Sequence, residues 1–147
     1  MTKRPRFRLT SPTQAQIKRA MRPKEIQIHC AYVAWTVRMR SMHPVLSRGF
    51  HPANGEQRDA KTGAKLQRMG VRAGVLDWCL PVARGGFAGL WIEFKRPGEK
   101  PTKVQASEIE QLRAEGHCVA VCDDWERAAQ LTMDYVAGKL KREMEPA

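Results

Sequence analysis

The spacing of apolar residues in the first third of the chain predicts one long helix. Pro23 suits the first position of a helix, and His43-Pro44 would end it. Between these points, apolar residues recur every three or four positions and mark one buried face, namely Ile28, Ala31, Tyr32, Trp35 and Met39. A short apolar stretch over residues 45–51 follows, and it predicts a strand.

The middle of the chain has a different pattern, with two short apolar runs on either side of a turn. The runs cover residues 75–80 and 90–95, and the turn between them ends in Gly85-Gly86. This pattern predicts an antiparallel hairpin centred on Gly85. Residues that face each other across such a hairpin have numbers that sum to 170.

Further helices and one strand are predicted around this hairpin. Residues 58–69 form a basic helix that Gly70 closes, and residues 102–115 form a helix with Thr102 and Gln105 as a capping box. A buried strand over residues 119–122 precedes a last helix, which opens at Asp123 with Glu126. The strand after the 102–115 helix should return parallel to residues 90–95. The fold class is therefore α/β, a mixed β-sheet flanked by α-helices.

The hairpin register places two acidic residues opposite each other. Asp77 and Glu93 interrupt the apolar runs, and their numbers sum to 170. Their Cβ atoms would lie about 4.5–5.5 Å apart on one face, and strand alternation adds Lys95 to that face. Facing carboxylates repel unless a cation lies between them, and oxygen ligands suit Mg²⁺. A salt-bridge ladder at the surface is the alternative interpretation.

Positive charge is concentrated in the first half of the chain. Residues 1–76 hold 16 Lys and Arg against 3 Asp and Glu, whereas residues 77–147 hold 10 against 12. This asymmetry indicates a polyanionic partner, most plausibly nucleic acid. Lys61, Lys65 and Arg68 share one face of the basic helix, which would contact phosphates or simply be solvated. Residues 1–22 are predicted to be a loose or disordered basic arm.

Other features of the sequence narrow the class of protein. No apolar run reaches membrane-spanning length, and no secretory stretch follows the basic N-terminus, so we expect a soluble intracellular protein without a membrane partner. The four cysteines lack the spacing of a zinc site or redox motif and are interpreted as small buried thiols. The four histidines are scattered, form no H-x-x-x-H pair and are likewise assigned to packing.

These residues, in this order, resemble a known family. The motifs are Glu25 in the first helix; His51-Pro52-Ala53-Asn54-Gly55 with Arg58; Gly70, Gly74 and Asp77; Glu93-Phe94-Lys95; and then Gln105 and Gly116. The pattern resembles the VRR-NUC domain of the PD-(D/E)XK nuclease superfamily, which has a restriction-endonuclease-like fold. The resemblance covers about residues 23–136, and the nuclease domain is assigned to residues 23–140, with 141–147 as a tail. The family usually has proline before the aspartate, where this chain has Leu76.

The resemblance implies roles for these residues. Asp77, Glu93 and the backbone carbonyl of Phe94 would bind Mg²⁺ or Mn²⁺, and Lys95 would lie beside the attacking water. Glu25 and Gln105 would join the active site rather than serve only at their helix ends. The residues expected to contact nucleic acid are Arg58, Lys61, Lys65, Arg68 and Arg72.

The expected function is metal-dependent, structure-specific hydrolysis of DNA. Stand-alone members of the family, often from phage, resemble Holliday-junction resolvases of DNA repair, so branched or junction DNA and a homodimer are the expected partners. The cytoplasm of a bacterial or phage-infected host cell is the expected location. Two alternatives are a flap- or end-directed nuclease, which would share the catalytic residues, and a non-catalytic DNA-binding accessory protein.

Overall fold

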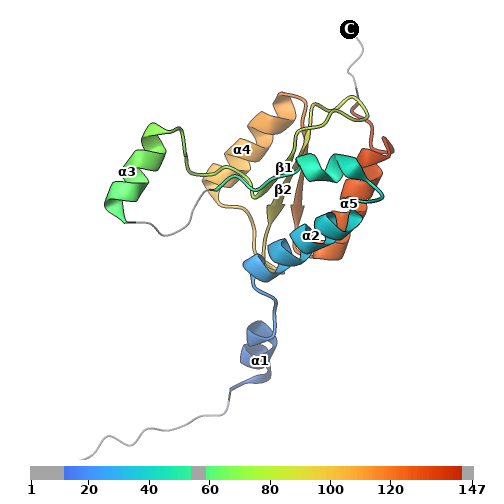
Figure 1. Cartoon of the computed structure of the whole chain (residues 1–147). Helices are drawn as coiled ribbons and strands as arrows, with labels where there is room; N and C mark the ends of the chain where they lie inside the picture. Colours follow the sequence, from blue (N-terminus) through green and yellow to red (C-terminus); the bar gives the residue numbers. More distant parts are fainter. Residues whose placement is uncertain (1–11, 54–58, 144–147) are drawn as a thin grey trace, which may run out of the picture.

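A three-stranded mixed sheet forms the centre of the protein (Figure 1). The computed structural model describes residues 12–53 and 59–143. Strands β1 (Trp78–Leu80), β2 (Leu90–Phe94) and β3 (Cys118–Cys122) lie in the order β1-β2-β3. The first pair is antiparallel and the second is parallel, so the predicted mixed α/β sheet is confirmed.

The hairpin has the predicted register. Trp78 pairs with Ile92, and Leu80 pairs with Leu90, so paired numbers sum to 170. At the turn, Gly85 and Gly86 both have positive φ angles, of 59° and 87°, between the bridged residues Arg84 and Phe87. Glycine adopts this backbone conformation without strain, which explains why the chain reverses here.

The two faces of the sheet are covered by different helices. Helices α2 (Glu25–Met39) and α5 (Trp125–Val136) cover one face, and their Tyr32 and Tyr135 are fully buried in the main core. Helix α4 (Lys103–Ala114) covers the other face, where Ile109 packs with Leu76 and Val119 in a smaller core. Leu76, at the position where the family usually has proline, is fully buried.

The helix ends are capped mostly as the sequence predicts. Thr102 Oγ1 accepts a hydrogen bond from the Gln105 backbone N–H, so the capping box of α4 is confirmed. The last helix differs by one position. Asp124, and not Asp123, is the N-cap of α5, because its side chain accepts a hydrogen bond from the Glu126 N–H.

Two segments near the N-terminus differ from the prediction. Residues 45–51 do not form a strand: Pro44–Arg48 is the 3₁₀ helix η1, because proline favours the start of a helical turn, and Phe50 makes only an isolated bridge to Cys79. Within the arm predicted to be loose, Gln14–Ala20 forms helix α1 with a capping box at Thr13. The sequence reading overlooked this cap.

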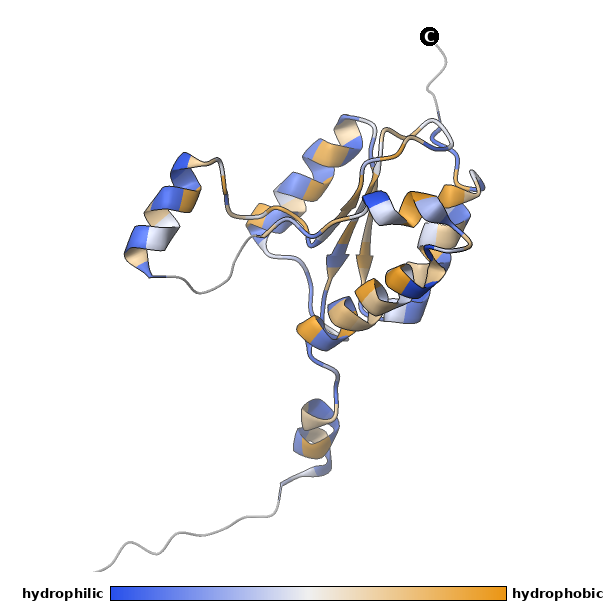
Figure 2. Ribbon diagram, in the orientation of Figure 1, coloured by the Kyte–Doolittle hydropathy of each residue, from blue (hydrophilic) through white to orange (hydrophobic). Residues whose placement is uncertain are grey.

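Two helices extend away from the sheet and its covering helices. Helix α3 (Ala60–Arg68) and helix α1 have no buried residues, and both lie apart from the remaining helices in Figure 1. Figure 2 shows several blue, hydrophilic bands on α3, whereas orange, hydrophobic colour appears on the strands and on α2, α4 and α5. No helix in the described ranges is long and apolar enough to span a membrane.

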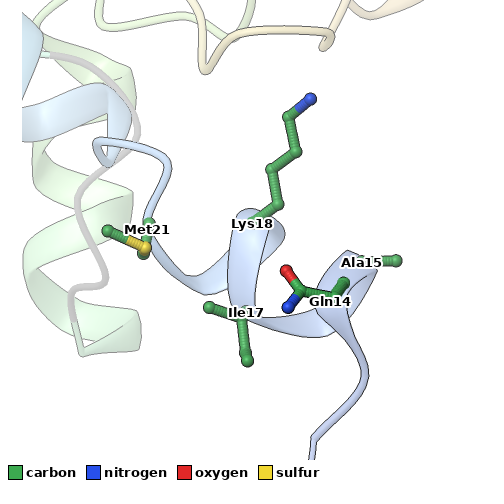
Figure 3. A pocket seen from close by; sticks show the side chains of 5 residues that line it. All are labelled: Gln14, Ala15, Ile17, Lys18 and Met21. Carbon is green, nitrogen blue, oxygen red and sulfur yellow. The ribbon is translucent and has the colours of Figure 1, made fainter.

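The surface of α1 carries a shallow hollow (Figure 3). Five residues at α1 line it, namely Gln14, Ala15, Ile17, Lys18 and Met21. None of them is an acid, histidine or cysteine, so the hollow lacks groups that bind a metal ion or activate water. The C-terminal end of α1 is tied to the loop after β2, where Arg96 donates to the Arg19 carbonyl at 3.2 Å.

Candidate active site

Three carboxylates gather at one end of the sheet. Asp77 immediately precedes β1, Glu93 lies near the end of β2, and Glu25 is the first residue of α2. The first turn of α2 lies at the end of the sheet where the β2 arrow finishes (Figure 1). One oxygen from each of the three carboxylates lies within 4.8 Å of the other two. The facing acids predicted from the hairpin register are therefore close together, and Glu25 joins them.

Glu93 is the deepest member of this carboxylate cluster (Glu25, Asp77 and Glu93). Its side chain is fully buried, and its Oε1 atom accepts hydrogen bonds from Lys95 Nζ at 2.7 Å and from Gln105 Nε2 at 2.6 Å. Its Oε2 atom is also buried but has no hydrogen-bond partner within the described part of the chain. Buried carboxylate oxygens normally find a partner, so this oxygen is available to a bound ligand.

Lys95 joins Glu93 and Glu25 electrostatically. Its ammonium group lies 2.7 Å from Glu93 Oε1 and 3.5 Å from Glu25 Oε2, and its side chain is only 9% exposed. Lys95 follows Glu93 by two positions, so strand alternation directs both side chains to the same face, as predicted. A buried ammonium group among carboxylates stays charged and can be held in one place.

Gln105 has two roles at once. Its Oε1 atom accepts the Thr102 backbone N–H at 3.0 Å, which completes the capping box of α4. Its Nε2 atom donates to Glu93 Oε1, so the same amide also holds the buried carboxylate. The sequence had suggested either the capping role or an active-site position, and the structure combines them.

The backbone of β2 orients Asp77. The N–H of Phe94 donates to Asp77 Oδ2 at 2.8 Å. Within a strand, the N–H and the C=O of one residue point to the same side, so the Phe94 carbonyl is directed toward the edge where Asp77 lies. This placement is compatible with the ligand role expected for that carbonyl.

The crowding of negative charge changes the protonation of these groups. Burial, reinforced by the charges of Asp77 and Glu25, raises the pKa of Glu93 to about 7. Burial likewise raises the pKa of Glu25. Burial alone would lower the pKa of Lys95, but its hydrogen bond to Glu93 and the surrounding carboxylates raise that pKa instead. A cation entering the cluster would therefore replace a proton on Glu93.

The cluster fits a hard divalent cation. It offers three carboxylates and a nearby backbone carbonyl, which is an all-oxygen donor set of the kind that Mg²⁺ and Mn²⁺ prefer. The unpartnered Oε2 of Glu93 gives an independent reason to expect a ligand there.

Two histidines to which the sequence analysis assigned no role in the site lie close to Asp77. Ligating atoms of His29, His51 and Asp77 come within 4.8 Å of one another. Burial lowers the pKa of His29, which favours the neutral imidazole. A signal for His29 was present, because it follows Glu25 by four residues on α2 and so shares its face. His51 comes from a distant segment, and no local spacing connects it to the site.

Three of the residues predicted to contact nucleic acid lie on α3, which stands apart from the sheet and its covering helices (Figure 1). Lys61, Lys65 and Arg68 are exposed on α3, and Arg58 lies outside the described residues. Arg72 forms a two-point ion pair with Glu108, at 2.6 Å and 2.9 Å, although its side chain is 58% exposed. Its charge is therefore largely matched within the protein.

The fold and part of the sequence match a known nuclease-domain protein. A solved structure named "VRR_NUC domain protein" is similar to this chain, with a TM-score of 0.66 and 27% sequence identity, and the match covers 79% of this chain and 90% of the other. In its fold and in part of its sequence, the chain resembles the VRR-NUC family. No family model matches the sequence. A search of curated proteins also gave no match.

The resemblance to the VRR-NUC family agrees with the architecture described above. The mixed sheet with helices on both faces is a restriction-endonuclease-like fold, as predicted. The family is one of nuclease domains, so the carboxylate cluster is the candidate active site of this chain.

Proposed function

We propose that this protein is a metal-dependent, structure-specific DNA endonuclease that acts as a homodimeric Holliday-junction resolvase. The observation that carries the proposal is the buried carboxylate of Glu93, which has one unpartnered oxygen and lies beside two other acids and Lys95. Packing alone gives no reason to bury these groups together, because a buried charge is costly unless it is fully paired.

The residues of the site would divide the work of phosphodiester hydrolysis. Asp77, Glu93 and the Phe94 carbonyl would hold Mg²⁺ or Mn²⁺, with Glu25 beside them. When bound, such an ion lowers the pKa of water and offsets negative charge on a phosphoryl group. Lys95 would donate to the water or to the phosphate and stabilise charge that develops during attack. Gln105 would hold Glu93 in place, and the Phe94 N–H would orient Asp77.

The charge distribution supports DNA as the substrate. Lys61, Lys65 and Arg68 lie on the exposed α3, at a spacing that places them on one face. Such a helix can follow a phosphate backbone without reading base sequence. The arm that carries α1 is also basic, and hydrogen bonds from Arg22 and Arg96 link it to the loop after β2. These surfaces favour a substrate recognised by shape.

The junction preference rests on the need for two symmetric cuts, which requires two active sites and hence a two-fold dimer. Phe50, Trp35 and Trp125 are the aromatic candidates for such an interface. Phe50 is 49% exposed, whereas Trp35 and Trp125 pack against the main core. Phe50 is therefore the best-supported contact for a second copy.

A panel of DNA substrates tests the proposal. Four-way junctions, flaps and linear duplexes would be incubated with the protein and Mg²⁺ or Mn²⁺, with EDTA as a blank. We expect junction cleavage that EDTA and Asp77→Ala abolish, while Glu110→Ala, at an exposed acid on α4, leaves it intact. Preferred cutting of flaps or ends would reassign the substrate. Binding without metal-dependent cutting of any DNA would refute catalysis.

A further inference from the structure

The two histidines beside Asp77 form a second ligand cluster next to the carboxylates. The histidine cluster consists of His29, His51 and Asp77, and it shares only Asp77 with the carboxylate cluster. Its members come from α2, from the segment after η1 and from the residue before β1. The fold therefore brings two imidazoles close to a carboxylate that already belongs to the carboxylate cluster.

The hydrogen bond of His51 prepares it to bind a metal ion. Its Nδ1 atom faces the backbone carbonyl of Asp77 within hydrogen-bond distance. A carbonyl oxygen can only accept, so Nδ1 carries the proton, and in the neutral ring Nε2 then keeps its lone pair. Histidines that bind metals usually donate their second ring N–H to a carbonyl or carboxylate in this way. This contact is separate evidence for a ligand at the cluster.

Aromatic packing fixes the ring of His29. It stacks on Phe94 with ring centroids 4.9 Å apart, and it meets His51 edge-on with centroids 4.8 Å apart. Its ring nitrogens form no hydrogen bond with the described residues, so neither is committed to another partner. The ring is therefore oriented by packing while its polar atoms remain available.

We propose that His29, His51 and Asp77 bind a divalent transition-metal ion such as Zn²⁺, in a site adjacent to the carboxylate cluster. Imidazole nitrogens favour Zn²⁺ and related ions, whereas Mg²⁺ favours oxygen ligands. Three protein ligands leave a coordination position open for water or phosphate. The histidine cluster shares Asp77 with the proposed nuclease site, but its binding of metal does not depend on cleavage.

Nuclear magnetic resonance of the imidazole rings tests the proposal directly. Zn²⁺ would be titrated into ¹⁵N-labelled protein carrying Cys30→Ser, because the exposed thiol next to His29 would compete for the ion. We expect the ring nitrogens of His29 and His51 to shift with Zn²⁺ and not with Mg²⁺. His43 and His117 act as internal controls. Unchanged His29 and His51 signals in excess Zn²⁺ would overturn the proposal. This measurement needs no substitution at His29 or His51.

Calorimetry then assigns the ligands. His51→Gln should weaken Zn²⁺ binding by about tenfold or more, whereas His43→Gln should leave it unchanged. Glu93→Gln, which disables the proposed nuclease site, should retain Zn²⁺ binding. Loss of binding in Glu93→Gln together with normal binding in His51→Gln would place the ion among the carboxylates and refute the proposal. Neither the NMR titration nor the calorimetry measures cleavage, so the outcome for the proposed Zn²⁺ site is independent of the proposed nuclease activity.

Discussion

Glu93 should destabilise the metal-free protein whenever it is ionised. In the folded chain its pKa is about 7, against a usual value of 4.5. The folded state therefore binds more protons than the unfolded state between these values. The contribution of this carboxyl to the free energy of unfolding is fully present below pH 4.5 and is lost as the pH rises through 7. The difference corresponds to an upper limit of about 3 kcal/mol in the free energy of unfolding.

Replacing Glu93 with glutamine should remove this cost. The new Oε1 can accept from Lys95 and Gln105 as before, and the amide nitrogen would occupy the place of the unpartnered Oε2. We expect Glu93→Gln to raise the melting temperature at pH 8 without metal, by about 4 °C for each kcal/mol recovered. At pH 4 the difference should be far smaller, because the wild-type carboxyl is then protonated.

Thermal unfolding at pH 4, 6 and 8 measures the effect, and Glu110→Gln on the exposed face of α4 is the matched control. Mg²⁺ should stabilise the wild type at pH 8 and should have little effect on Glu93→Gln. A variant that melts at or below the wild-type temperature at pH 8 would contradict the argument. An equal difference at pH 4 and pH 8 would do the same, because ionisation of Glu93 would then not be the cause.

Three other outcomes follow from the same geometry. Lys95→Met should slow cleavage by about 10²-fold or more while DNA binding is retained, since in the proposed mechanism the ammonium group would act on the reacting phosphate. Gel shifts would measure binding, and cleavage rates would measure catalysis. Binding of Mn²⁺ should weaken by about tenfold per pH unit below pH 7, because a proton on Glu93 competes with the ion. Calorimetry in buffers that differ in ionisation heat should detect the proton that Glu93 releases when Mn²⁺ binds. Neutralising the three basic residues of α3 together should lower the slope of log affinity against log salt by about 3. Fluorescence anisotropy on duplex DNA would measure the slope, and an unchanged slope would exclude α3 from the DNA contact. These residues are Lys61, Lys65 and Arg68.

The parts of the fold set by short-range patterns could be predicted from the sequence. The hairpin register followed from two apolar runs around Gly85-Gly86, and the capping box of α4 followed from the spacing of Thr102 and Gln105. The register alone placed Asp77 near Glu93. Glu25 entered the predicted site only through the family resemblance, because its position depends on how α2 packs against β2.

Features that depend on tertiary contacts were predicted less well. His51 reaches Asp77 across 26 positions in the sequence, and nothing in its local pattern indicates that contact. Arg72 appeared free to bind phosphate until the structure showed its pairing with Glu108, 36 residues away. The apolar stretch at residues 45–51 also has strand-like composition, but only Phe50 finds a bridge partner, so no strand forms.

The double attachment of Gln105 restricts what can replace it. Asparagine is one methylene shorter, so it could not reach both the Thr102 backbone N–H and the Glu93 carboxylate, which lie on opposite sides of the amide. Glutamate could still accept at the helix end, but it would add a fourth negative charge to an already repelling group. One side chain thus caps the start of a helix and also holds the buried acid that is proposed to bind an ion. A substitution at this position would change both contacts.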